Sequence, residues 1–366
     1  NLGIRFDYFN SNGRVLSDPS DPSIYNPIRP ENRIATIDER FSYWYKNASG
    51  KVMLSPRFGA SFPFSDQGVI HFSYGHFFQI PQFELLYHNS DFDLGQGTGN
   101  VGYVGNADLD PEKTISYELG FKYQPSPYMV LDATFYCRDI RNLTGTRSDE
   151  ISMFGGASTY SKYENSDFAF VKGLVLSTKY FSMDGFSSNI NYTIQQAKGT
   201  ASSPSQAWNA NQGGSIAETY MIPLDWDQLH TLSTILSYSK NNYGISLIGK
   251  IGSGFPYTPL SSTNISSLIQ NSDKKPITST FDLKSYYMFS VGPIGLQVYF
   301  NIFNLFDKLN QSGVYDDSGV ANYTTYEQQA VNQNTGQHVN TIQEWFNNET
   351  YYSNPRRVEI GFKYDF

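Results

Sequence analysis

The sequence predicts an all-β protein, a transmembrane antiparallel β-barrel, and three observations support this prediction. Twelve segments alternate between apolar and polar residues with a period of two, the pattern of strands whose faces meet different surroundings. Short and long connections between these segments alternate along the chain. Aromatic residues make up 16% of a chain that is only 39% hydrophobic, a mixture that suits strands with lipid-facing and lumen-facing residues in equal number.

The alternating segments have the length that a membrane strand needs. Most are close to the about 9–11 residues with which a tilted strand crosses a bilayer. The chain has no run of about 18 apolar residues, so we expect no transmembrane helix. In order, the expected strands are 1–10, 52–63, 68–78, 114–124, 128–138, 168–181, 188–195, 229–239, 243–253, 279–290, 294–304 and 356–366.

The connections between these strands sort into two classes. An outer-membrane barrel has short turns on the periplasmic side and long loops outside, so this sorting places the first strand running outward and the last running inward. The short connections are 64–67, 125–127, 182–187, 240–242 and 291–293, and the long ones are 11–51, 79–113, 139–167, 196–228, 254–278 and 305–355.

Composition and motifs argue against several classes of function. The formal net charge of -8 argues against a nucleic-acid partner. A single cysteine, Cys137, leaves no intrachain disulfide. The five histidines lack metal-ligand spacing and no G-x-S-x-G nucleophile motif occurs, so we expect no metal, no cofactor and no enzyme activity.

Several motifs, in their order along the chain, carry a family resemblance. GNADLDPEKTISYELGF (105–121) resembles a segment of TonB-dependent outer-membrane receptors, although Ala107 stands where that family usually has proline. LSPRFGASFPF (54–64), HFSYGHFFQIP (71–81), IGSGFPYTP (251–259) and NIFNLFDKLN (301–310) are similar to further segments of these barrels. Together these motifs resemble those of the larger receptors with a carboxypeptidase-like N-terminal extension found in Bacteroidetes-like bacteria.

The resemblance implies a location, a function and a set of partners. It implies that residues 1–366 are a partial barrel domain of about 12 strands, the C-terminal half of a barrel of about 22 strands, with the N-terminal plug and first strands absent. It implies the bacterial outer membrane and TonB-dependent active uptake of a scarce nutrient, whether a siderophore, a vitamin, a glycan or a peptide. The implied partners are outer-membrane lipid, the protein's own plug, TonB, the barrel-assembly machinery and the nutrient. Two alternatives stay open: a complete smaller barrel that acts as a hydrolase, or a passive or adhesive barrel.

Three groups of residues follow from the strand pattern and the resemblance. Asn106, Pro111 and Glu112 of the long motif are expected to anchor neighbouring loops. Phe362, Tyr364 and Phe366 alternate in the last strand and resemble the signal that the barrel-assembly machinery reads. Charged and histidine side chains on the polar strand faces are expected to line the lumen and pair with each other and with a plug: Arg57, His71, Glu118, Lys122, Asp132, Arg138, Lys250, Asp282, Lys284, Glu359 and Lys363.

Aromatic residues in or near the long loops are candidate ligand contacts, because their rings stack on sugars, peptides and siderophores alike. The alternative is that the loops pack on one another through these rings. Loops 79–113 and 305–355 are expected to contribute to ligand capture, and the competing interpretation is that they shield the lumen. The candidate residues are Tyr74, His76, Phe78, Tyr87, His88, Trp208, Trp226, Tyr315 and Trp345.

Overall fold

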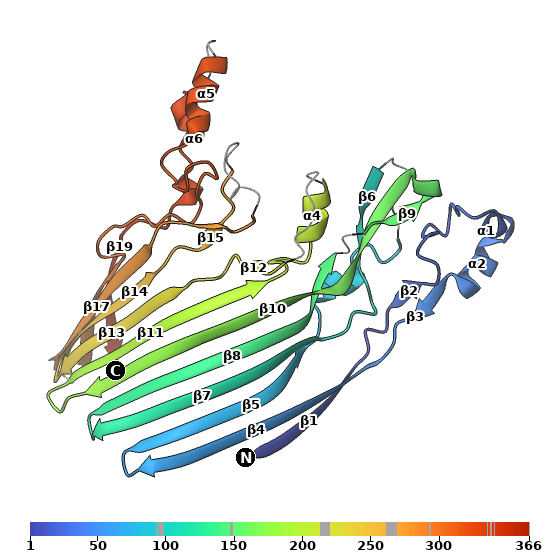
Figure 1. The fold of residues 1–366 in the computed structure, drawn as a ribbon. Helices are drawn as coiled ribbons and strands as arrows, with labels where there is room; N and C mark the ends of the chain where they lie inside the picture. The colour runs from blue at the N-terminus through green and yellow to red at the C-terminus, as the bar shows by residue number, and fades with distance from the viewer. Residues whose placement is uncertain are drawn as a thin grey trace.

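A broad, curved antiparallel sheet forms the body of the protein, and its longer connections gather at one end (Figure 1). The computed structural model describes residues 1–92, 94, 99–146, 149–212, 220–260, 269–292, 294–334, 336, 339 and 341–365. No helix in this part of the chain is long and apolar enough to cross a membrane.

Twelve strands are hydrogen-bonded to one another in their order along the chain, which confirms the predicted strand set. Several strands run further than expected; β10 begins at Ser158 rather than at 168, and β11 continues to Gly199. The strands are β1 (Leu2–Phe9), β4 (Lys51–Ser65), β5 (Gly68–Gln79), β7 (Glu112–Ser126), β8 (Met129–Thr146), β10 (Ser158–Phe181), β11 (Phe186–Gly199), β13 (His230–Lys240), β14 (Tyr243–Gly252), β17 (Thr278–Val291), β18 (Ile294–Phe303) and β19 (Arg357–Asp365).

The short connections lie together at the end of the sheet opposite the long ones, as the spacing predicts (Figure 1). Only residues 66–67 separate β4 from β5, and 241–242 separate β13 from β14. The left-handed conformations of Asn241 (φ 51°) and Gly185 (φ 89°) belong to such tight turns, which need residues that tolerate positive φ.

The long connections carry secondary structure of their own. The first folds into a two-stranded ribbon, β2 with β3, that encloses two short helices, and β6 and β9 extend the sheet along β10. These elements are β2 (Arg14–Leu16), α1 (Pro30–Ile34), α2 (Ile37–Tyr43), β3 (Tyr45–Asn47), α3 (Phe83–Tyr87), β6 (Gly99–Val104), β9 (Ile151–Met153), η1 (Phe154–Gly156), α4 (Gln206–Gln212), β12 (Ile222–Pro223), β15 (Pro256–Tyr257), β16 (Asp273–Lys274), α5 (Thr325–Gln333), α6 (Ile342–Phe346) and η3 (Glu349–Tyr351).

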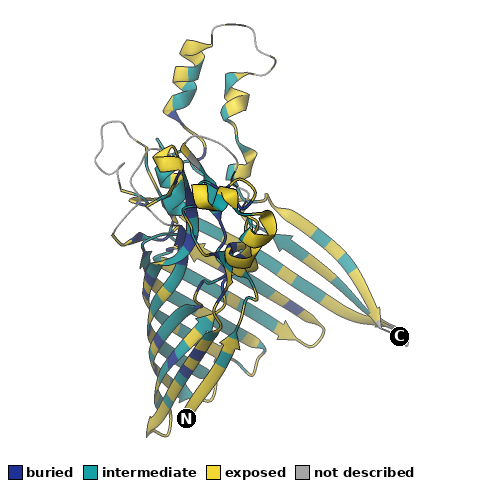
Figure 2. Cartoon of the chain, turned by 90° about the vertical axis from the view of Figure 1, so that its right-hand side faces the viewer, coloured by how far each residue is buried: buried dark blue, intermediate teal, exposed yellow. Residues whose placement is uncertain are grey.

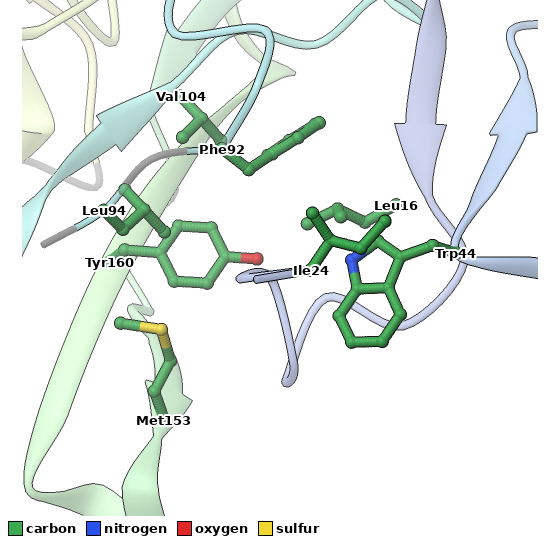
Figure 3. Close-up of a cluster of buried hydrophobic side chains, with 8 residues drawn as sticks. All are labelled: Leu16, Ile24, Trp44, Phe92, Leu94, Val104, Met153 and Tyr160. Atoms are coloured by element: carbon green, nitrogen blue, oxygen red, sulfur yellow. The ribbon is translucent and has the colours of Figure 1, made fainter. Parts of the chain in front are cut away.

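A hydrophobic core at the mouth, the end of the sheet where the long connections gather, joins three of these connections (Figure 3). The Tyr160 hydroxyl donates to the carbonyl of Pro19 at 2.6 Å, and the Trp44 indole N–H donates to the carbonyl of Pro22 at 3.3 Å. The connections therefore form a packed unit rather than separate loops. We call the cluster the mouth core; its buried members are Leu16, Ile24, Trp44, Phe92, Leu94, Val104, Met153 and Tyr160.

The two faces of the sheet differ as the alternation predicts. Exposed and partly buried residues alternate along the strands (Figure 2). One face carries apolar side chains from every strand of the path, a continuous belt of the kind that faces lipid. In chain order, the strand register aligns on this outer face Ile4, Phe62, Ile70, Leu119, Phe135, Leu174, Ile190, Leu236, Leu247, Leu283, Val298 and Ile360.

Candidate functional site

The opposite, inner face of the sheet is a polar wall. The register puts all eleven charged or histidine candidates of the sequence on this face, because each lies one residue out of phase with the apolar belt. Acidic and basic members are interspersed around it. The eleven are Arg57, His71, Glu118, Lys122, Asp132, Arg138, Lys250, Asp282, Lys284, Glu359 and Lys363.

The ion pair between Arg138 and Glu118 on this wall is long and solvent-exposed. The Arg138 guanidinium lies 4.0 Å from the Glu118 carboxylate, and both side chains are more than a third exposed. Glu118 also accepts a hydrogen bond of 3.4 Å from Ser73, on the neighbouring strand. Exposed pairs of this kind contribute about 0–1 kcal/mol each, so they can exchange partners at little cost.

A hollow of about 360 Å³ opens on the wall around Arg57. The Arg57 guanidinium lies 4.7 Å from the centre of the Phe77 ring, and Glu118 and Ser116 line the same hollow. Gly75 faces Arg57 across the strand pair and leaves room for this packing. The hollow thus offers a cation, an anion and a ring within one small surface.

The long motif (105–121) makes contacts that hold the connections together at the mouth. A Cβ on Gly105 would lie 2.6 Å from the His88 backbone nitrogen, so only glycine allows this close approach. The Asn106 amide donates to the Tyr163 carbonyl at 2.9 Å and so reaches the extended end of β10. Lys51 bridges Asp108 at 3.1 Å and Asp110 at 2.9 Å.

Asp108 is the most heavily bonded carboxylate of this motif. Partial burial raises its pKa, but hydrogen bonds from the Ser49 hydroxyl and backbone N–H and the Lys51 ammonium outweigh burial, and the pKa of Asp108 is lowered. The Ser49 bonds measure 2.6 and 2.8 Å. These contacts tie the motif to the start of β4.

A second hollow, of about 240 Å³, lies where the motif meets the wall. Glu112 and Asp167 line it together with Thr144, whose buried hydroxyl has no hydrogen-bond partner among the described residues. Asp167 accepts a hydrogen bond of 2.9 Å from the Thr200 hydroxyl. Asp167 and Thr144 were not predicted, because they lie beyond the strand ends that the alternation marks; the only signal was the position of Asp167 directly before the segment 168–181.

Three aromatic candidates lie in a strand, within the expected segment 68–78. Tyr74, His76 and Phe78 lie within β5, and the register places them in phase with Phe72 on the apolar outer face. The Tyr74 hydroxyl and His76 Nε2 are 2.6 Å apart and so bond to each other. These residues therefore do not belong to a loop, and they face away from the polar wall.

Three further candidates hold the connections together. The Tyr87 hydroxyl donates to the Ser11 carbonyl. The His88 ring stacks on Tyr103 at 4.9 Å, and the Trp208 ring meets the same tyrosine edge-on at 5.0 Å. These contacts match the alternative in which loops pack through their rings.

The remaining three candidates lie over the later strands. Trp226 precedes β13 and is 45% exposed. The Tyr315 hydroxyl donates to the Phe346 carbonyl at 2.5 Å. Trp345, on α6, is 81% exposed. Trp345 is thus the candidate ring most open to solvent.

The C-terminal strand completes the apolar belt. Phe362 lies opposite Val298, and Tyr364 lies opposite Leu296, both on the outer face. Phe366 lies outside the described residues, so its predicted role in assembly stays a prediction. Among the described residues, no group of three or more His, Cys, Asp or Glu side chains is arranged to hold a metal ion.

Comparison with known proteins gives a family and a fold. The family model described as "TonB dependent receptor-like, beta-barrel" matches residues 1–305. The outer membrane transporter YddB from Escherichia coli is similar in structure, with a TM-score of 0.53 and 12% identity over 73% of this chain and 38% of that chain. The ferric enterobactin receptor PfeA from Pseudomonas aeruginosa (a mutant) gives a TM-score of 0.52 and 18% identity over 86% of this chain and 40% of that chain. The chain thus spans two fifths or less of the length of these two structures, and no curated protein matches it.

Proposed function

The chain belongs to the TonB-dependent receptor-like β-barrel family, and from this premise we propose that it forms part of the barrel wall of an active outer-membrane transporter. The outer membrane is the location of this family. The observation that supports the proposal best is the pair of faces: an apolar belt across twelve strands and, behind it, a polar wall with both signs of charge. Lipid meets the belt, and the nutrient passes along the wall.

The proposal includes a larger barrel. Among the described residues β1 pairs with β4 alone and β19 with β18 alone, so both are edges of the sheet. Unpaired backbone groups in lipid cost several kcal/mol each, and closed barrels avoid that cost. We propose that further strands, to a total of about 22, close the sheet. Residues 1–366 then form part of this barrel domain.

A plug inside the barrel gives the polar wall its second role. We propose that an N-terminal plug domain pairs with wall residues such as Arg57, Glu118 and Arg138. Because exposed ion pairs are worth about 0–1 kcal/mol each, the plug is held and can still be moved when TonB pulls on it. The short turns then face the periplasm and the long connections the medium. A carboxypeptidase-like extension stays a prediction of the resemblance alone.

Growth of matched strains tests the proposed function. Strains with and without the full-length receptor, each with and without TonB, are grown on single limiting sources: a ferric siderophore, cobalamin, an oligosaccharide or a peptide. We expect one source to support growth only when both receptor and TonB are present. Uptake that needs the receptor but is equal without TonB would contradict active transport and support a passive barrel.

A further inference from the structure

The helical arm formed by α5 (Thr325–Gln333) and α6 (Ile342–Phe346) projects beyond the other connections, away from the sheet (Figure 1). Both helices begin with side-chain caps: Thr324 accepts from the Tyr326 N–H at 3.1 Å, and Thr341 accepts from the Glu344 N–H at 3.1 Å. The arm is braced at its base, where the Tyr315 ring stands 6.2 Å from Phe346 and 5.2 Å from Tyr351. The two helices are therefore capped and braced, and they present a defined surface.

An apolar groove runs between the two helices of the arm. It measures about 390 Å³, and Ala330 of α5 faces Ile342, Trp345 and Phe346 of α6 across it. Trp345 leaves 81% of its side chain open to solvent. An exposed Trp beside an apolar groove is a common anchor for a ligand side chain.

The segment of chain that carries the groove has charged residues of one sign only. From residue 309 to 355 the chain has no Lys or Arg but five acidic residues: Asp316, Asp317, Glu327, Glu344 and Glu349. All 26 basic residues lie outside this segment, as do 29 of the 34 acidic residues. Positive and negative charges are therefore nearly equal in number in the rest of the chain. A segment with this charge attracts cations and repels anionic ligands.

From these observations we propose that the α5–α6 arm is a docking site for short cationic peptides that carry an apolar side chain. The apolar side chain enters the groove beside Trp345, and the peptide's Lys or Arg residues meet Glu327 and Glu344. The groove is lined by only a few residues, whereas a stable protein–protein interface buries about 800 Å² on each partner. The arm therefore suits a free peptide better than a folded protein. The inference rests on the proposed function only for placing the arm outside the cell.

Calorimetry with the full-length protein in a nonionic detergent tests this site. The probe is the amidated, acetylated peptide Lys-Leu-Lys-Phe-Lys-Leu-Lys, and its comparison is the same peptide with Glu in place of Lys. We expect only the cationic peptide to bind. Its affinity should fall as the salt concentration is raised from about 20 to about 200 mM, because salt screens the attraction between exposed charges. Equal binding of the two peptides, or no binding of the cationic one, would overturn the proposal.

Variants of the arm separate the apolar from the electrostatic part. Trp345→Ala should weaken binding at least about tenfold, the loss typical of a central Trp anchor. Glu327→Gln with Glu344→Gln should weaken it about twofold to tenfold, and a Gln at 344 keeps the cap that Glu344 makes with the Thr341 N–H at 3.0 Å. Ile34→Ala, an equally exposed apolar residue on α1, is the matched control and should bind normally.

Unchanged binding in Trp345→Ala and in the double variant would place the peptide elsewhere and overturn the proposal. Circular dichroism of each variant establishes that the arm and barrel stay folded. The binding measurement uses neither TonB nor transport. If the peptide does not bind the arm, the proposed transport function is therefore unaffected. If growth proves independent of TonB, the binding result is unaffected.

Discussion

Gly105 shows how a single residue determines how closely the backbone packs at the mouth. Its α-carbon packs so tightly that a Cβ would lie 2.6 Å from the His88 nitrogen and 2.9 Å from the Leu86 carbonyl. Gly105→Ala should therefore lower the free energy of unfolding by about 1–3 kcal/mol, since backbone atoms must shift. Denaturant unfolding of the full-length protein measures this change. Gly295→Ala is the control, because nothing lies within 4 Å of a Cβ there; equal losses in both variants would contradict the packing argument.

Asp108 makes a pH-dependent contribution at the same place. Its pKa is held below the ordinary value of 3.8 by Ser49 and Lys51, against the opposing effect of burial. A carboxylate with a lowered pKa stabilises the folded state above its unfolded pKa, and this contribution is lost as pH falls through the folded pKa. The melting-temperature difference between the unmodified protein and Asp108→Asn should be full at pH 6 and shrink below pH 3.8.

At the residue scale, the sequence indicates on which face of the sheet a strand residue lies, but not which residues meet at the mouth. Period two alone placed Lys250 and Glu359 on the same face as Arg57, because alternation fixes the side of the sheet. The same rule, had it been applied through the end of β5, would have put His76 on the outer face. Asp167 could not be found, because the register shifts around it and the alternation breaks.

At the scale of elements, the apolar belt gives each strand two chemically opposite faces. Leu247 and Ser246 are neighbours in the middle of β14, the first on the outer face and the second on the inner face beside Ser237. Leu247→Arg should cost about 2–4 kcal/mol in a bilayer, as a cation near the midplane does, and Ser246→Arg should cost clearly less. Folding titrations of the full-length protein in lipid vesicles measure both, and a larger cost at Ser246 would reverse the assignment of faces.

The long connections show where sequence patterns carry less information than strands. Strands were predicted because their periodicity is local, whereas the mouth core forms from residues as distant as Pro19 and Tyr160. No spacing in the sequence announces such contacts. The helices were also too short for a clear 3.6-residue pattern; α1 and α6 have five residues each.

At the scale of the whole molecule, the sheet has two edges, β1 and β19, within the described residues. Each edge leaves a row of backbone groups without sheet partners, which costs several kcal/mol per group in lipid. The 366-residue chain refolded alone in detergent should therefore aggregate, whereas the full-length protein should be monodisperse. Size-exclusion chromatography with light scattering distinguishes the two; a monodisperse, heat-resistant barrel from this chain alone would contradict the proposed larger barrel.

The central claim is that one face of this sheet meets lipid and the other lines a water-filled path, and spin labels test it most directly. With Cys137 replaced by serine, single labels are placed in the full-length protein at Val298 and Gln297, neighbours on opposite faces of β18. In vesicles, collisions with oxygen, which concentrates in lipid, should dominate at 298, and collisions with a water-soluble nickel chelate should dominate at 297. The same pattern should repeat at Leu247 and Ser246. A label at 298 or 247 that collides mainly with the nickel chelate would contradict the account.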